Sequence, residues 1–218
     1  MTSSELLDLF REEMNDVAQP YLWSDAIIFA YLDATQKTFC RLTEGIEDST
    51  TTAVTQAVLD AGEEWITLDP RVLKVREVVD ASTGRPYKIF NMETATEYGV
   101  LFNGRQGQIE AFVSGLSKHK LRAWPIPTAQ TTVCLRVFRL PLEAITDAGD
   151  QSLEVDEQHH FHLLTGMKAL AYLKEDVETF NKTKASEHDT RFRAYCEQSR
   201  REQGRVRREV GTVLYAGL

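Results

Sequence analysis

The hydrophobic pattern of this chain changes twice, and those two changes restrict its fold more than any single motif. Apolar residues recur at helical spacing over residues 1–46, and the same spacing returns from Leu153. Between Asp48 and Leu140 the composition turns to threonine, glycine and β-forming residues. Helical spacing and strand-like runs imply different elements. The sequence therefore predicts an α+β fold with helices at both ends and a β-rich middle.

The size of the chain predicts one compact body rather than a string of domains. The chain has 218 residues, of which 42% are hydrophobic and 27% charged, and these are ordinary values for a soluble globular protein. We expect N-terminal helices in residues 1–46, a β-rich segment in 47–152, C-terminal helices in 153–199 and a projecting arm in 200–218. No apolar run approaches the ~20 residues that a membrane-spanning helix needs, so no membrane partner is expected.

Two helices are predicted before the β-rich segment. Ser3 or Ser4 can cap a first helix whose apolar positions extend to Val17 and which Pro20 ends, because a serine side chain accepts hydrogen bonds from free backbone N–H groups and proline cannot continue a helix. Ser24 can cap a second helix, which keeps one apolar face up to Gly45. These two helices make up the N-terminal part of the expected fold.

Seven short strands are predicted in the middle of the chain. They are Ala53–Val58, Glu64–Leu68, Val72–Val79, Tyr87–Phe90, Gln108–Ser114, Lys120–Trp124 and Thr131–Arg139. The run Ser82–Gly84 has the composition of a hairpin turn, so antiparallel pairing is expected. Apolar residues on both faces of the last strand predict that it is covered on both sides, in part by a neighbouring subunit. Pro141 is expected to end the β-rich segment.

Two further helices are predicted after the β-rich segment. Asp156 can cap the first, in which small residues such as Gly166 would let another helix approach closely. A longer helix is expected from about Lys184. Its apolar positions stop at Ser199 although helix-forming residues continue, so the remainder is expected to project from the body.

The end of the chain differs in charge from the rest of the protein. Six arginines and three glutamates lie between Phe192 and Val210, whereas the whole chain has a formal net charge of -8. An apolar peptide, VGTVLYAGL, follows them. We expect a docking arm made of Arg200, Arg201, Arg205, Arg207, Arg208, Val210, Val213, Leu214, Tyr215 and Leu218.

Three roles are open for these arginines. A basic helix can neutralise phosphates, but aromatic residues are not interleaved with the arginines and the acidic body would repel DNA. A solvated helix end is the simplest alternative, since cations are favourable near a helix C-terminus. Arginine is also enriched at protein interfaces. The apolar tail favours the third role, because an extended apolar peptide can add to the sheet edge of another protein.

No enzyme, metal site or cofactor is predicted. His159, His160 and His162 are potential metal ligands, but in a helix the first and third share a side and His160 points elsewhere. They are therefore expected to be ordinary helix-face residues. The run Gly104–Gly107 lacks the lysine and the third glycine of phosphate-binding loops. The three cysteines are far apart in the sequence, and each is expected to act as a small hydrophobic residue in a reducing compartment.

Both helical ends carry a resemblance to a known family. The N-terminal segment YLWSDAIIFAYLDATQKTFCRL places an aromatic-Trp-Ser-Asp cap before a helix with Tyr-Leu-Asp-Ala in its centre. In the C-terminal segment an acidic cap, a histidine, a helix ending in ALAYL and a helix beginning with KASEHDTRF follow one another. This order resembles the head-to-tail adaptor (connector) proteins of tailed bacteriophages. The β-rich centre is similar only to podovirus-like members with an inserted sheet.

The resemblance implies a fold, an assembly and a set of partners. The fold would be a bundle formed by the N- and C-terminal helices, with an inserted antiparallel β domain and an extended C-terminal arm. The protein would form a homo-oligomeric ring, expected to be a dodecamer, beneath the portal protein in the virion neck. The arm would dock on the portal, other surfaces would receive a tail or nozzle protein, and DNA would pass through the ring without specific binding. Assembly would take place in the host cytoplasm.

One alternative function belongs to a different class. The chain would then be a nucleic-acid-binding or regulatory module that uses its C-terminal arginine-rich helix on phosphates. Salt-dependent binding of random duplex DNA would favour this alternative over a structural virion protein.

Overall fold

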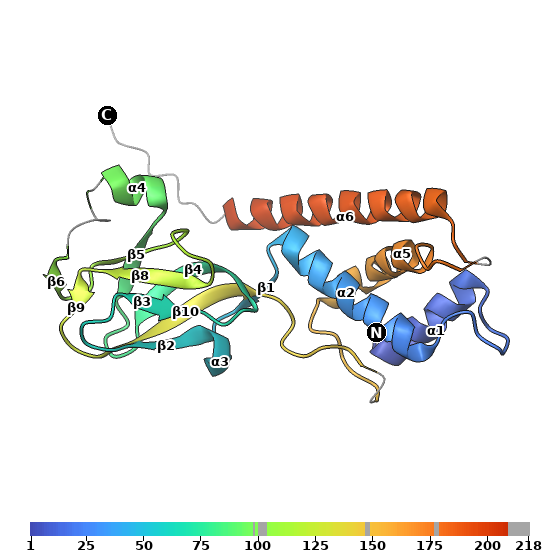
Figure 1. The fold of residues 1–218 in the computed structure, drawn as a ribbon, viewed down its shortest axis with the longest axis horizontal. Coiled ribbons are helices and arrows are strands. Elements are labelled where there is room, and N and C mark those ends of the chain that lie inside the picture. Colours follow the sequence, from blue (N-terminus) through green and yellow to red (C-terminus); the bar gives the residue numbers. More distant parts are fainter. Residues whose placement is uncertain (98, 100–103, 147–148, 177–178, 209–218) are drawn as a thin grey trace. The chain divides into compact units, whose positions relative to one another are not determined.

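The computed structural model describes residues 1–97, 99, 104–146, 149–176 and 179–208, with backbone only for 206–208. The chain forms two compact units (Figure 1). Met1–Gly45 and Pro141–Leu218 make up a helical unit, and Ile46–Leu140 make up a β-rich unit. The α+β class predicted from the sequence, with helices from both ends of the chain, is confirmed.

Helix α1 (Ser3–Met14) begins and ends earlier than the sequence indicated. Its N-cap is Thr2, whose side chain accepts from the backbone N–H of Glu5, while the Glu5 side chain bonds back to the Thr2 backbone. Such a capping box satisfies two N–H groups that a helix start otherwise leaves free. The helix stops at Met14 because Asn15 adopts a left-handed conformation, with φ 55°. The prediction that the helix runs close to Pro20 was therefore wrong.

Helix α2 (Asp25–Thr43) follows the prediction closely. Ser24 is its N-cap residue, although the serine side chain makes no capping hydrogen bond. The helix ends where Glu44 and Gly45 both have positive φ values, 84° and 89°, a conformation that commonly ends helices. Its buried residues include Ile28, Leu32 and Phe39, which lie on the predicted apolar face.

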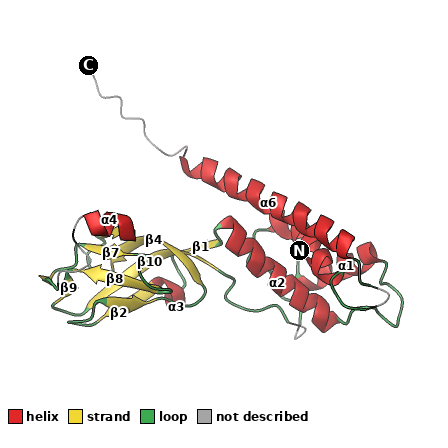
Figure 2. Ribbon diagram, turned by 45° about the horizontal axis from the view of Figure 1, so that its top comes forward, coloured by secondary structure: helices red, strands yellow, loops and turns green. Residues whose placement is uncertain are grey.

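The C-terminal helices complete the helical unit. A short 3₁₀ turn, η1 (Glu157–His159), leads into α5 (His160–Ala171), and α6 (Lys182–Arg208) follows. Helix α5 packs against α2 and α6, and α1 packs against α2 and α5. Figure 2 shows α6 as the longest of these helices, and at 1.5 Å per residue it spans about 40 Å.

Gly166 lies where three helices meet. A Cβ atom at this position of α5 would lie 2.5 Å from Cγ2 of Thr35 on α2 and 3.3 Å from the Phe192 ring on α6. Both neighbours are buried, so neither has free space to move into. The predicted close approach of another helix at this glycine is confirmed.

Substituting Gly166 with alanine is expected to destabilise the helical unit. Overpacking a core costs about 1–3 kcal/mol, which exceeds the gain of up to about 1 kcal/mol from alanine's helix propensity. Urea unfolding followed by circular dichroism at 222 nm measures the change. The matched control is Gly204→Ala on α6, where an added Cβ meets nothing within 4 Å. The double variant with Thr35→Ser, which removes the clashing methyl group, should recover most of the loss, and no recovery would contradict the packing argument.

The β-rich unit contains an eight-stranded mixed sheet and a small two-stranded sheet. The strands are β1 (Ile46–Asp48), β2 (Gln56–Leu59), β3 (Trp65–Thr67), β4 (Val72–Asp80), β5 (Pro86–Phe90), β6 (Gln106–Gly107), β7 (Ala111–Val113), β8 (Lys120–Trp124), β9 (Ile126–Pro127) and β10 (Thr131–Arg139). The large sheet has the order β1-β10-β4-β5-β7-β8-β3, and β2 also pairs with β10. Strands β6 and β9 form the small sheet.

Most predicted strands are present, but two short helices and all parallel pairing were missed in this unit. Residues Thr52–Thr55 form helix α3, so the predicted strand at Ala53–Val58 begins only at Gln56. Strands β5 and β7 run parallel, as do β6 and β9, whereas only antiparallel pairs were expected. The connection between β5 and β7 contains helix α4 (Met92–Glu97), and a parallel return needs a long connection of this kind.

The long strand β10 is covered more on one face than on the other. Val133, Leu135 and Val137 are buried on one face, whereas Arg136 on the other face is exposed and Phe138 is buried. The second face is therefore only partly covered within this chain. The expectation that a neighbouring subunit covers the rest stays a prediction.

The segment from Pro141 to Ser152 belongs to the helical unit, although the sequence placed residues up to 152 with the β-rich segment. Its contacts with the start of α1 explain the difference. The backbone N–H of Ser3 donates to the carbonyl of Gln151 at 2.9 Å. The N–H of Ser4 donates to Asp150 at 3.1 Å, which places an anion at the N-terminus of α1, where the helix dipole favours it.

Candidate functional site

The C-terminal half of α6 carries the arginines singled out in the sequence. Along the first part of the helix Ala185, Phe192, Cys196 and Ser199 are buried. After Ser199 no side chain described in α6 is buried. The buried face therefore ends where the sequence predicted, while the helix itself continues to Arg208.

The described arginines beyond Ser199 are exposed. Arg200, Arg201 and Arg205 all lie on the surface of α6. Arg201 hydrogen-bonds to Glu197 one turn earlier, an exposed pair of the kind that contributes little to stability. Arg200 and Arg205 form no ion pair with any side chain that the structure describes. The guanidinium groups of Arg200 and Arg205 are therefore available to carboxylates or phosphates of a partner.

The remaining residues of the predicted docking arm lie outside what the structure describes in atomic detail. Arg207 and Arg208 belong to α6 by their backbone alone. Val210, Val213, Leu214, Tyr215 and Leu218 lie outside the described residues. Their part in docking stays a prediction.

The connection from α1 to α2 contains a buried ionic cluster that the sequence did not predict. Nη1 of Arg11 lies 2.8 Å from Oδ2 of Asp16, and the two side chains are only 8% and 2% exposed. Nη2 donates to the carbonyl of Trp23 at 3.2 Å and also to Asp25. The guanidinium carbon lies 3.7 Å from the centroid of the Tyr21 ring, within range of a cation–π contact.

Asp16 also organises the backbone of this connection. Its carboxylate accepts from the backbone N–H of Leu22 at 2.8 Å and of Trp23 at 3.3 Å. The Trp23 ring packs edge-on against Phe10, with centroids 5.8 Å apart. The run from Tyr21 to Asp25 thus holds α1 and α2 together through these contacts. This gives a physical role to the motif that carries the family resemblance.

The comparison with known families covers nearly the whole chain. The sequence profile described as SU10 adaptor protein matches residues 1–213. The chain belongs to the SU10 adaptor protein family. A comparison with curated protein sequences gave no match. Family membership makes this protein a structural adaptor of a phage and supports the resemblance drawn from its helical ends.

The histidines of this adaptor form part of a packed joint between helices. Nδ1 of His159 lies 2.7 Å from the hydroxyl of Tyr195 on α6, and the His162 ring stacks on the Tyr195 ring with centroids 3.4 Å apart. Phe39 on α2 packs against His159 at 4.7 Å. His160 faces elsewhere and its Nε2 lies 2.6 Å from the Val155 carbonyl oxygen. The predicted division of the three histidines between two sides is confirmed.

Burial keeps the groups at this joint uncharged. Loss of solvation lowers the pKa of His159 and of His162, so both rings are neutral at pH 7. The unprotonated ring nitrogen of a neutral His159 can accept a hydrogen bond from the Tyr195 hydroxyl group. Burial also raises the pKa of the Cys196 thiol to about 12, and a protonated, buried thiol is unreactive.

Within the described parts of the chain no group of three or more His, Cys, Asp or Glu side chains is arranged to hold a metal ion. None of the helices described there has the length and apolar character to cross a membrane.

Proposed function

We propose that this adaptor forms a ring beneath the portal and links the portal to the tail in the neck of a podovirus-like virion. The ring is a homo-oligomer, expected to be a dodecamer, with a continuous channel for DNA. A tail or nozzle protein binds another surface of the ring, and assembly takes place in the host cytoplasm. The match to the SU10 adaptor family over residues 1–213 is the observation that carries this proposal.

The arm for portal docking consists of the exposed arginines of α6 and the tail beyond them. Exposed arginines that lie past the buried face of their own helix can pair with carboxylates of a partner. The apolar residues Val210, Val213, Leu214, Tyr215 and Leu218 would supply the anchors that dominate binding energy in protein interfaces. Docking through a single segment also leaves the helical core intact.

The net charge of the chain supports a channel through which DNA slides. A formal charge of -8 disfavours non-specific binding of the phosphate backbone. The DNA-binding alternative uses the same exposed arginines on phosphates and predicts salt-dependent binding of the isolated protein to random duplex DNA. Elution of the protein from a duplex DNA column without retention at low salt would count against that alternative.

Deleting residues 210–218 is expected to abolish co-purification of the adaptor with cognate portal rings. Reversing the charge of Arg200, Arg201 and Arg205 to glutamate should weaken attachment by at least about tenfold, because charge reversal at an interface costs more than 1.4 kcal/mol. The matched control reverses Lys182, Lys184 and Arg191, which are exposed at the other end of α6. Portal attachment that survives both changes to the arm would refute the docking assignment.

A further inference from the structure

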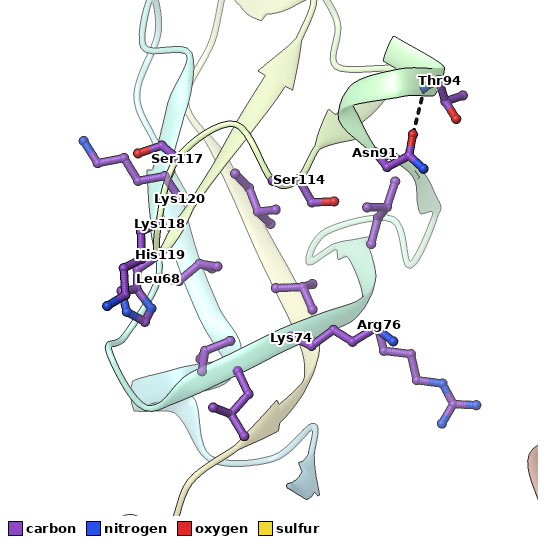
Figure 3. Close-up of a pocket in the computed structure, with 16 residues that line it drawn as sticks. Leu68, Lys74, Arg76, Asn91, Thr94, Ser114, Ser117, Lys118, His119 and Lys120 are labelled. Atoms are coloured by element: carbon purple, nitrogen blue, oxygen red, sulfur yellow. Dashed lines mark hydrogen bonds between the residues drawn. The ribbon is translucent and has the colours of Figure 1, made fainter. Parts of the chain in front are cut away.

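The β-rich unit contains a groove where its sheet opens. The groove has a volume of about 890 Å³ and is lined by 16 residues from β4, β5, β8 and the connections near them (Figure 3). Strand β4 forms one wall, and the segment from Ser117 to Leu121 forms another. Figure 3 shows Lys118, His119 and Lys120 gathered at one side, with Lys74 and Arg76 on β4.

The lining is basic although the chain is acidic. Lys74, Arg76, Lys118, His119 and Lys120 line the groove, and none of its lining residues is aspartate or glutamate. The β-rich unit as a whole carries 11 acidic and 11 basic side chains, so a groove without carboxylates is a local separation of charge. Arg76 pairs with Glu47 outside the groove at 2.7 Å. Lys118 and Lys120 are exposed, and neither forms an ion pair with a described residue.

The floor of the groove is apolar. Leu68, Val72, Leu73, Val75, Ile89 and Leu121 contribute to its lining. Val72 and Leu121 are buried, whereas the Leu73 residue is 38% exposed. Exposed apolar side chains inside a concave surface are typical of a binding site. The groove therefore combines apolar positions with a cationic rim.

One edge of β4 is open along this groove. β4 pairs with β10 from Val72 to Asp80, but β5 joins β4 only at Val78 and Val79. The stretch from Val72 to Glu77 thus has no strand on its second side among the described residues. An unpaired edge presents backbone N–H and C=O groups to an incoming strand.

The lining fits a peptide better than a nucleic acid. Duplex DNA presents a convex, hydrophilic phosphate ridge, which would leave an apolar floor such as that at Leu73 without a partner. Single-stranded nucleic acids are held by aromatic platforms, and no phenylalanine, tyrosine or tryptophan lines the groove. An extended peptide instead offers a free backbone edge and side chains that alternate between two faces.

We propose that this groove binds an extended acidic segment of another protein, which adds as a strand to the open edge of β4. Carboxylates on one face of the segment pair with Lys118 and Lys120, and apolar side chains on the other face cover Leu73 and its neighbours. The added strand satisfies the backbone groups of Val72–Glu77. This site shares no residue with the portal-docking arm, so either assignment can fail without the other.

Fluorescence anisotropy of a labelled peptide with alternating glutamate and valine tests the proposal on the full chain. The double variant Lys118→Glu and Lys120→Glu is expected to weaken binding by at least about tenfold. The matched control, Arg85→Glu with Lys88→Glu, makes the same charge change at exposed positions of the same unit outside the groove and should leave binding unchanged. Hydrogen exchange confirms that both variants keep the fold.

Three further probes separate strand addition from simple charge attraction. A peptide with alternating lysine and valine should not bind, and a version of the acidic peptide with N-methylated backbone amides should lose binding, because it cannot pair with a strand edge. Failure of the acidic peptide to bind would overturn the proposal, as would equal binding of the N-methylated version. If labelled duplex DNA binds to the wild-type protein and this binding is lost in the Lys118 and Lys120 double variant, the groove would be assigned to phosphate instead.

Discussion

Replacing Arg11 with methionine is expected to lower the free energy of unfolding of the helical unit by about 3–5 kcal/mol. The change leaves the carboxylate of Asp16, 2% exposed, without its charged partner. A buried charge that loses its partner costs far more than an exposed one, because water cannot replace the lost interaction. The guanidinium also holds the Trp23 carbonyl and Asp25, so the connection between α1 and α2 should loosen.

Urea unfolding followed by circular dichroism at 222 nm measures this loss. Hydrogen exchange of peptides from α1 and α2 should rise in the same variant. The matched control is Arg193→Met on α6, which removes an exposed pair with Asp189 and should change stability by less than about 1 kcal/mol. An equal loss in the free energy of unfolding from Arg11→Met and Arg193→Met would show that burial does not determine how much the ion pairs of Arg11 stabilise the protein.

Replacing Asp48 with alanine is expected to destabilise the β-rich unit by about 3–5 kcal/mol. Asp48 lies at the end of β1, and its Oδ2 is 2.6 Å from Nε of Arg139, the last residue of β10. The two side chains are 4% and 7% exposed. The ion pair therefore closes the β-rich unit where the chain enters and leaves it, and the substitution leaves Arg139 buried without this partner.

The same carboxylate predicts a dependence on pH. Burial alone would raise the pKa of Asp48, but hydrogen bonds from Thr51, Thr50 and Arg139 outweigh burial and lower the pKa well below its ordinary value. A group whose pKa falls on folding stabilises the folded state above its unfolded pKa, about 4 for aspartate. That stabilisation is present at pH 7, begins to fall near pH 4, and is lost progressively as the pH drops toward the lower pKa of the folded state.

Hydrogen exchange of peptides from β4 and β10, measured between neutral and acidic pH, tests the predicted loss of stability in Asp48→Ala and the predicted loss of stability in acid. Protection in the wild-type protein should fall in acid, and the slope should be flatter in Asp48→Asn, which cannot titrate at this position. The exposed pair between Glu77 and Arg136, 3.7 Å apart on the same sheet, supplies the control Glu77→Gln, with a loss below about 1 kcal/mol. An unchanged acid slope in Asp48→Asn would contradict the role given to this carboxylate.

The sequence predicted the helical unit better than the β-rich unit. Helix α2 and the buried face of α6 up to Ser199 follow from apolar spacing, because a helix is formed by hydrogen bonds between residues four apart. The end of α1 at Asn15 was missed because the apolar spacing continues to Val17, although asparagine is, after glycine, the residue that most readily adopts the left-handed conformation that ends this helix. The candidate docking arm was predicted from its arginines, from the end of the apolar positions at Ser199 and from the apolar tail. The exposure of Arg200, Arg201 and Arg205 follows from where the buried face of α6 stops.

The spacing of apolar residues along the chain thus predicts the long helices, most of the strands and the α+β class, and the small side chain of Gly166 predicts the close approach of another helix. Apolar spacing does not specify which strands pair, since any two strands with matching faces are compatible. Two features exist only once the sheet has formed. One is the parallel pair of β5 and β7, and the other is the ion pair between Asp48 and Arg139, which lie 91 residues apart in the sequence. The same holds for the basic groove beside β4, because its lysines come from β4, from the turn before β8 and from the start of β8. Local spacing reflects hydrogen bonds between near neighbours, whereas contacts between distant residues depend on how the finished elements pack.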